Sequence, residues 1–275
     1  MKVLISADME GTTGVTCLDD VIPERSGYPR FRKLLTNDVN AAIEGALEAG
    51  ATEIVISEAH SHSRNILIEE LNPKAKMITG FLGRRYDMME GIDDMFDAVF
   101  LVAYHAKAGT DSAVINHTLF LNILNFWING VLVGEGGISA AWAGHFNVPV
   151  VLVTGDDKVA SEMMELLGDV EPSVVKRGLH DYTAECLTPK ESYETIKNSA
   201  KRALKRLKDF KPYKIKPPVT IDVEFASTSP ASLACIYPKV VRKEPRKISF
   251  TSGDLIETMN TILASTMLAS TDKNW

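Results

Sequence analysis

A chain of 275 residues can bury a substantial core, and its length predicts one large domain with an appendage, or two domains. Its 45% hydrophobic and 24% charged residues are ordinary for a soluble globular protein, and the net charge of −6 disfavours a nucleic-acid partner, which requires a clustered basic surface. Three widely spaced cysteines, the lack of an apolar run long enough to span a bilayer, and a core strand beginning at Lys2 predict a cytoplasmic protein without a membrane partner.

The segment Lys2–Ala7 is a short apolar run, which predicts a strand buried on both faces of a parallel sheet. Asp8 and Glu10 follow directly, and Gly11 and Gly14 allow the backbone to turn beside them. In open α/β sheets, ligands bind outside the carboxyl ends of the strands. Two carboxylates in such a crevice repel each other, and a bound cation relieves that repulsion. This strand end therefore predicts a cation site, and the alternative is a turn whose acids are solvated or cap a helix.

Two further buried strands end next to histidines. The segment 52–57 is followed by His60, and the segment 97–104 ends directly before His105. A helix expected over 36–50 would join the first two strands in a right-handed βαβ unit. Because parallel strands share one carboxyl edge, we expect these imidazoles to lie near the two acids of the first strand.

A β-hairpin is predicted at 125–133, because Asn129-Gly130 suits a type I′ turn between two apolar strands. The hairpin leads into a glycine-rich stretch that is expected to place Glu135 in a loop of unusual backbone freedom. A helix over 139–146 and a buried strand over 148–154 are expected to follow.

The other elements are predicted from periodicity and breakers: an irregular connection at 18–35, helices around 86–96 and over 158–167, 189–210 and 255–268, and strands at 219–225 and within 236–250. Composition changes at Tyr213. We therefore expect an α/β fold with a mostly parallel sheet flanked by helices, forming a metal-binding catalytic domain over residues 1–212. A smaller C-terminal α+β module is expected over residues 213–275, and residues 113–134 can pack with it.

The carboxylates and imidazoles at the strand ends suit zinc or a similar divalent ion, and the complete candidate ligand set is Asp8, Glu10, His60, His105 and Glu135. Five ligands exceed what one catalytic zinc uses, so two metals that share a carboxylate are expected, with Asp8 as the bridge. Such a pair lowers the pKa of a bridging water and polarises a carbonyl, which predicts a hydrolase. His117, outside the ligand set, is expected to transfer protons or stabilise an oxyanion.

Each candidate ligand also has an ordinary structural interpretation. A single histidine at a strand end is more often a hydrogen-bonded structural residue than a metal ligand. Spacing alone leaves His62 as an alternative to His60, and Glu135 can equally be an exposed loop residue. The motif spacing matches no short zinc signature, so the hypothesis depends on the convergence of all the strand ends.

A different chemistry is the main alternative. The stretch Asp8-Met-Glu10-Gly11-Thr12 resembles the signature of haloacid-dehalogenase-like phosphatases, and Gly155-Asp156-Asp157 resembles their late magnesium motif. In that case Asp8 would be a phosphoryl-accepting nucleophile, Glu10 the acid/base and Mg²⁺ the cofactor. This alternative leaves the histidines without a role, and we rank it second.

Several separated segments occur in an order typical of one peptidase family: Asp8-Met-Glu10-Gly11, residues 57–61 around His60, Tyr104-His105-Ala106, Asn116-His117, Val133-Gly134-Glu135 and Gly155-Asp156-Asp157. Over essentially the whole chain, the sequence resembles the zinc D-aminopeptidases encoded with bacterial dipeptide-transport genes. The resemblance implies two zinc ions per subunit with Asp8 bridging, and His117 as the catalytic residue. Asn116 and Thr118 stand where the family usually has serines, and Asn116 is the candidate substrate-binding residue.

The resemblance also implies removal of N-terminal D-amino acids, such as D-alanine, from short peptides. It implies a homo-oligomer, a decamer whose inner chamber holds the active sites. The first hypothesis is therefore a dinuclear zinc aminopeptidase and the second the magnesium phosphatase. A third is a non-enzymatic peptide-binding accessory protein of a transporter, which would bind peptides without cleaving them.

Overall fold

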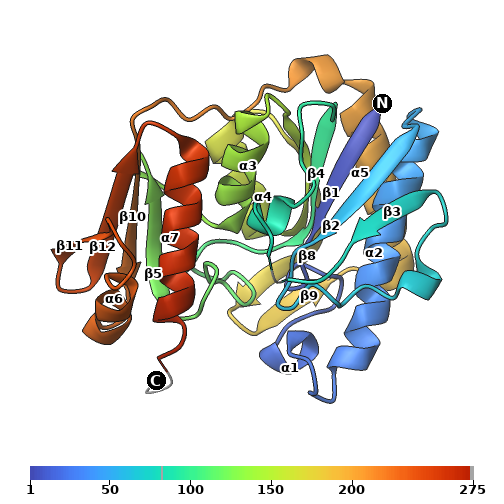
Figure 1. The fold of residues 1–275 in the computed structure, drawn as a ribbon. Helices are drawn as coiled ribbons and strands as arrows, with labels where there is room; N and C mark the ends of the chain where they lie inside the picture. The colour runs from blue at the N-terminus through green and yellow to red at the C-terminus, as the bar shows by residue number, and fades with distance from the viewer. Residues whose placement is uncertain (82, 273–275) are drawn as a thin grey trace.

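Residues 1–81 and 83–272 are described by the computed structural model, and they form two β-sheets with helices between and around them (Figure 1). The main sheet has the strand order β3-β2-β1-β4-β7-β8-β9, and the smaller sheet has the order β11-β12-β10-β5-β6. In Figure 1 the smaller sheet lies on the left with α7 against it, and the main sheet lies on the right.

The main sheet is parallel from β3 to β8 and ends in one antiparallel pair, β8 with β9. Its strands are β1 (Lys2–Ala7), β2 (Glu53–Glu58), β3 (Ala75–Ile78), β4 (Ala98–Tyr104), β7 (Val150–Asp156), β8 (Glu171–His180) and β9 (Thr183–Cys186). All residues of β4 and β7 are buried, because helices cover both faces of the sheet, so both strands are almost continuously apolar. The predicted mostly parallel α/β sheet is confirmed.

Alternate residues of β1 point into two separate hydrophobic cores. Val3 and Ile5 pack with helices α2 and α5 on one face, whereas Leu4 packs with α3 and α4 on the other. The bounds of these helices are α2 (Tyr28–Glu48), α3 (Glu135–His145), α4 (Asp157–Leu167) and α5 (Pro189–Lys205). β1 is thus held from both sides, and its carboxyl end is a rigid starting point for the residues that follow.

The smaller sheet is antiparallel and combines two distant parts of the chain. Its strands are β5 (Ile123–Ile128), β6 (Val131–Leu132), β10 (Val219–Phe225), β11 (Val241–Glu244) and β12 (Lys247–Ser252), and the helices beside it are α6 (Thr228–Ala234) and α7 (Leu255–Ala269). β5 pairs with β10, Ile128 opposite Ile221, so residues before α3 complete the sheet of the C-terminal segment. Asn129 and Gly130 have φ of 49° and 82°, as the type I′ turn of the predicted hairpin requires.

Two expected boundaries differ from the structure. α2 begins at Tyr28 instead of residue 36, because Pro29 occupies a favourable first-turn position, and the Thr36 hydroxyl bonds back to the Arg32 carbonyl at 2.8 Å inside the helix. The helix expected around 86–96 is only a 3₁₀ turn, η2 (Asp87–Met89), because Gly91 has a φ of 86°.

Sequence patterns did not predict these further elements: α1 (Leu18–Val21), η1 (Ile68–Glu70), β3, β8, β9 and α6. The helix expected over 189–210 ends at Lys205 and is followed by a separate 3₁₀ turn, η3 (Leu207–Asp209). None of the helices in the described ranges combines the length and hydropathy that a membrane crossing requires.

Candidate metal centre

Three strand ends meet at one edge of the main sheet. β1 lies between β2 and β4, and Ala7 is in register with Glu58 on one side and Val102 on the other. The residues that follow these strands, Asp8, His60 and His105, are therefore brought to the same point, as the parallel arrangement predicts.

Asp8 lies between two imidazoles and offers one carboxylate oxygen to each. Its Oδ1 is 3.4 Å from His60 Nδ1, and its Oδ2 is 3.4 Å from His105 Nε2. Glu10 reaches the His60 side, with Oε2 3.0 Å from Nδ1. Glu135 reaches the His105 side, with Oε2 3.4 Å from Nε2. The five predicted ligands thus form two half-sites that share Asp8.

Glu135 does not lie in a flexible loop, as the glycine-rich sequence led us to expect; it is the buried first residue of α3. Gly136 and Gly137 belong to the helix, where a side chain on either would clash with neighbouring Met163 or Val133. Oε1 of Glu135 accepts a hydrogen bond from the Leu119 amide at 2.7 Å, which leaves Oε2 facing His105. The helix N-terminus and this hydrogen bond both favour a charged carboxylate.

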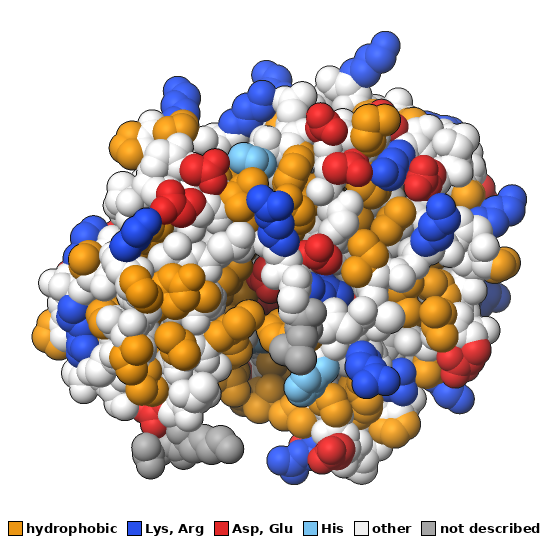
Figure 2. Space-filling model, in the orientation of Figure 1, with side chains coloured by type: hydrophobic (Ala, Val, Ile, Leu, Met, Phe, Trp, Pro, Cys, Tyr) orange, Lys and Arg blue, Asp and Glu red, His pale blue; other side chains and the backbone are white. Residues whose placement is uncertain are grey.

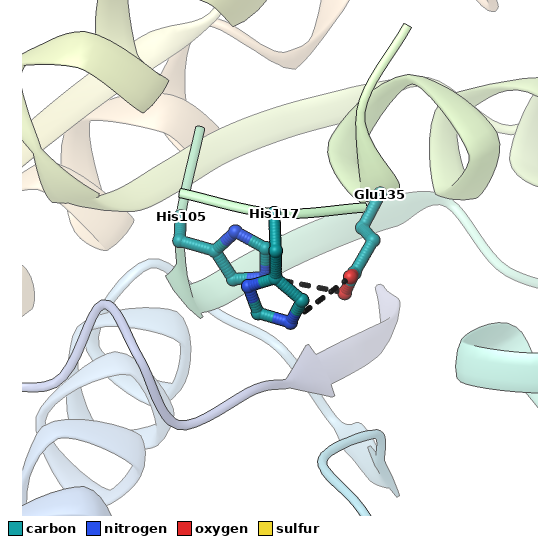
Figure 3. Close-up of side chains that lie close together, drawn as sticks. All are labelled: His105, His117 and Glu135. Carbon is teal, nitrogen blue, oxygen red and sulfur yellow. Dashed lines mark ion pairs between the residues drawn. The ribbon is translucent and has the colours of Figure 1, made fainter. Parts of the chain in front are cut away.

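His117 stands beside this half-site, as Figure 3 shows. Its ring stacks on that of His105 with centroids 4.0 Å apart and an interplanar angle of 9°, and its Nε2 is 3.6 Å from Oε1 of Glu135. The expected proton-transfer residue is therefore at the centre, and it is close enough to be an additional ligand.

The hydrogen bonds of the three histidines fix which nitrogen faces inward. His60 Nε2 contacts the Val21 carbonyl at 2.9 Å, His105 Nδ1 the Ala106 carbonyl at 3.0 Å, and His117 Nδ1 the Ile115 carbonyl at 2.8 Å. A carbonyl oxygen can only accept, so each of these nitrogens carries the proton. The opposite nitrogen of each ring faces the centre, where its lone pair would be available to a metal in the neutral ring, as in metal-binding histidines.

The donor set fits a divalent transition metal. Among the described residues, Asp8 Oδ2, Glu10 Oε2 and His105 Nε2 are buried atoms without a hydrogen-bond partner. Potential ligand atoms of Asp8, Glu10 and His105 lie within 4.8 Å of one another, and the same holds for His105, His117 and Glu135. Buried orphan acceptors are rare in native proteins, and carboxylates mixed with imidazoles suit zinc.

The charges of the centre are strongly perturbed. Burial, with the neighbouring Glu10, raises the pKa of Asp8 to about 7. Burial alone would raise the pKa of Glu10 as well, but His60 holds it well below its usual range. Burial and His105 lower the pKa of His117, so this imidazole is neutral near pH 7 and can accept a proton.

Comparison with known proteins identifies the family. Residues 1–264 match the M55 peptidase family, described as D-aminopeptidase. The chain belongs to this family. The D-aminopeptidase of Bacillus subtilis (strain 168) is 32% identical over 270 residues, which cover 98% of each chain. The solved structure of Zn-dependent D-aminopeptidase DppA from Bacillus subtilis, a self-compartmentalizing protease, is 31% identical with a TM-score of 0.97 over 99% of each chain.

Family membership confirms the prediction of a metallo-aminopeptidase, and the zinc-dependent relative supports zinc as the metal. The phosphatase alternative also lacks its magnesium motif in the structure. Asp156 caps α4, accepting hydrogen bonds from the amides of Lys158 and Val159 with Oδ1 and from Val114 with Oδ2. Because both oxygens of Asp156 already accept backbone hydrogen bonds, this carboxylate is not free to bind magnesium.

Two other residues that the sequence suggested for the site, His62 and Asn116, make contacts outside the proposed ligand set. His62 is exposed and its Nδ1 contacts the adjacent Ser61 hydroxyl at 3.2 Å, whereas His60 pairs with the acids Asp8 and Glu10. Asn116 holds its own loop together: its Oδ1 accepts from the Gly109 amide at 2.9 Å and its Nδ2 donates to the Ala113 carbonyl at 3.1 Å.

Sequence analysis missed the residues that hold the ligands in place. The buried Lys176 donates from Nζ to the carbonyls of Glu10, Thr12 and Val15 at 2.5, 3.1 and 2.8 Å, and so fixes the turn that carries Glu10. Glu58 accepts hydrogen bonds from the amides of Asn65 and Ile66, which orders the loop after His60. No sequence spacing links these residues to the ligands, because they meet only in the folded chain.

Asp38 on α2 connects the turn that follows Glu10 to the helix layer, and its role can be tested by the pH dependence of stability. Its carboxylate accepts from the Thr13 amide at 2.9 Å and the Thr13 hydroxyl at 3.0 Å, yet burial raises its pKa to about 7. The native state therefore binds more protons than the unfolded state between about pH 4 and 7, so this group lowers the free energy of unfolding as the pH rises.

The variant Asp38→Asn should remove this pH-dependent contribution. Its free energy of unfolding, relative to the natural protein, should rise by on the order of 4 kcal/mol between pH 4 and pH 8, at 1.36 kcal/mol per pKa unit. Urea unfolding of both proteins in the same zinc-containing buffers measures the difference. Parallel stability curves for the two proteins would contradict the assignment.

Two connected cavities meet at the metal centre, and both include His60 and His117 in their walls. The smaller, of about 380 Å³, is also lined by Asp8 and Glu135 and by Leu263 and Met267 of α7. The larger, of about 700 Å³, contains Glu10. Figure 2 shows the hollow between the two parts of the molecule, bordered by hydrophobic and charged side chains. The second sheet and its helix thus complete the site that the main sheet begins.

Proposed function

We propose that this enzyme holds two zinc ions per subunit and releases N-terminal D-amino acids from short peptides. The observation that carries the proposal is the position of Asp8, whose two oxygens face two different imidazoles, each accompanied by a glutamate. One aspartate shared by two half-sites is the arrangement of a dinuclear hydrolase. Zinc at these ligands would polarise the scissile carbonyl and lower the pKa of water.

His117 supplies the proton transfer in this proposal. Its Nδ1 donates to the Ile115 carbonyl, which holds the ring with the basic Nε2 toward Glu135 and the cavities. Because the ring is buried and neutral, it can take the proton of the attacking water and return it to the departing amine. The Leu119 amide donates to Oε1 of Glu135, the oxygen that faces His117, and so fixes the carboxylate with Oε2 toward His105.

The D-amino-acid substrate is proposed from the named activity of the relative, and the size of the cavities supports short peptides. Metal quantitation on protein purified without chelator should give about two zinc ions per chain, the stoichiometry of a dinuclear site. In the same preparation, D-alanyl dipeptides should be hydrolysed faster than their L-alanyl and N-acetylated counterparts. Binding of peptides without cleavage, whichever divalent metal is added, would favour a transport accessory protein instead.

We also propose a homo-oligomer, a decamer in size, since the related DppA is described as a self-compartmentalizing protease. Light scattering coupled to size-exclusion chromatography tests the mass directly. A cytoplasmic location is proposed because Cys17, Cys186 and Cys235 are all free thiols, which is typical of a reducing compartment.

A further inference from the structure

One carboxylate in the smaller cavity has no role in the metal centre. Asp87 begins the short turn η2 and lines the cavity together with Asp8 and Glu135. Its Oδ2 is buried and, among the described residues, has no hydrogen-bond partner. Its backbone has a φ of 52°, a left-handed conformation that is uncommon outside glycine and that often marks functional sites.

Arg84 and Arg85 precede Asp87 closely in the sequence, and the charge of Arg84 favours the ionised form of Asp87 without forming an ion pair with its carboxylate. Arg84 donates to the backbone carbonyls of Gly80 and Asp87 at 2.7 and 3.2 Å and to the Ser57 hydroxyl at 3.4 Å, but to no carboxylate oxygen of Asp87. Met88 and Leu263 of α7 line the smaller cavity together with Asp87, and a neighbouring cavity of about 340 Å³ is lined by Asp87 with Arg84 and Arg85. Burial and the charge of Glu135 raise the pKa of Asp87 to about 6. A bound ligand that carries a positive charge would stabilise the ionised form of such a carboxylate.

We propose that Asp87 binds the α-ammonium group of the substrate's N-terminal residue and thereby makes the enzyme an exopeptidase. The inference rests on the proposed peptidase function and adds the orientation of the peptide. Asp87 borders the smaller cavity and, within the described residues, is not part of the wall of the larger one. The N-terminal residue therefore occupies the smaller cavity, the scissile bond lies at the metal centre, and the rest of the peptide extends into the larger cavity.

The anchoring role has a kinetic signature. The ammonium group does not react, so its ion pair with Asp87 is the same in the bound substrate and in the transition state, and its loss raises KM with little change in kcat. A charge-assisted hydrogen bond in a buried site corresponds to an effect of about 10- to 100-fold. Asp87→Asn is a suitable variant, because asparagine tolerates positive φ and has nearly the same shape.

The experiment uses the zinc-loaded enzyme with D-alanine p-nitroanilide as substrate and two competitive inhibitors, D-alanine hydroxamate and propanohydroxamate, which differ only in the amino group. Asp87→Asn should raise KM about 10- to 100-fold and reduce the preference for the amino-bearing hydroxamate by the same factor, with unchanged zinc content. Asp94→Asn, the same charge change at an exposed position, should behave like the natural protein.

The outcomes separate the two proposals. If the natural enzyme releases no p-nitroaniline, the proposed function fails, and the anchoring role fails with it. If the natural enzyme is active and Asp87→Asn keeps the full preference for D-alanine hydroxamate over propanohydroxamate, the anchoring role alone is wrong. A loss of kcat with an unchanged inhibitor preference would likewise show that Asp87 acts on the fold or the metal instead of the ammonium group.

Discussion

Replacing His117 with alanine should lower kcat for D-alanine p-nitroanilide by about 10²- to 10⁴-fold, the usual contribution of a positioned general base. The neutral Nε2 of this ring faces Glu135 at 3.6 Å inside the cavity, and no other imidazole in the described residues combines that position with a lowered pKa. Because the five proposed ligands remain, the zinc content of the variant should stay within error of the natural enzyme.

The matched control is His180→Ala, which removes an exposed imidazole from the end of β8 and should leave both kcat and zinc content unchanged. Steady-state kinetics and metal analysis on the same samples decide the role of His117. If His117→Ala loses zinc in proportion to activity, this histidine is a ligand of the His105 half-site, which its stacked position on His105 would permit.

Changes at Asp8 and His60 should have different effects on metal stoichiometry. Asp8→Asn removes the carboxylate charge that faces both imidazoles, so we expect less than about one zinc per chain and a loss of activity of at least about 10³-fold. His60→Ala removes a ligand from one half-site only, and the other half-site keeps Asp8, His105 and Glu135. That variant should retain about one zinc per chain.

Metal quantitation after dialysis, together with competition by a chromogenic chelator, measures both stoichiometries. His62→Ala is the control for His60→Ala, because this neighbouring histidine is exposed and its Nδ1 contacts the Ser61 hydroxyl at 3.2 Å. Equal zinc contents in the Asp8 and His60 variants would contradict a shared aspartate and would support a single metal with all ligands around it.

Much of this centre could be predicted from the chain because parallel strands share one carboxyl edge. One short apolar run is followed by Asp8, and two others are followed by His60 and His105. These three candidate ligands must meet if the strands are neighbours. Strand pairing in the structure places β1 between β2 and β4, and so brings these ends together. Local sequence thus determines the sheet and the ligand chemistry at its edge.

Glu135 shows where sequence patterns fail. Consecutive glycines predict a flexible loop, but Gly136 and Gly137 lie inside α3, where close packing against Met163 and Val133 leaves no space for a side chain. A glycine can be present because the backbone is flexible or because close packing leaves no room for a side chain. A single sequence does not distinguish these two reasons. The start of α2 at Tyr28 was missed for a similar reason, since Pro29 can break a helix or begin one.

By itself, the sequence determined the periodicities, and through them an α/β sheet whose strands end in acids and histidines. The choice of His60 over His62, the helical position of Glu135, the support of the Glu10 turn by Lys176 and the unpaired Asp87 in the cavity were decided by tertiary structure. The physical reason is that side-chain direction and burial depend on contacts between segments far apart in the chain. Periodicity carries information about neighbours within one element only.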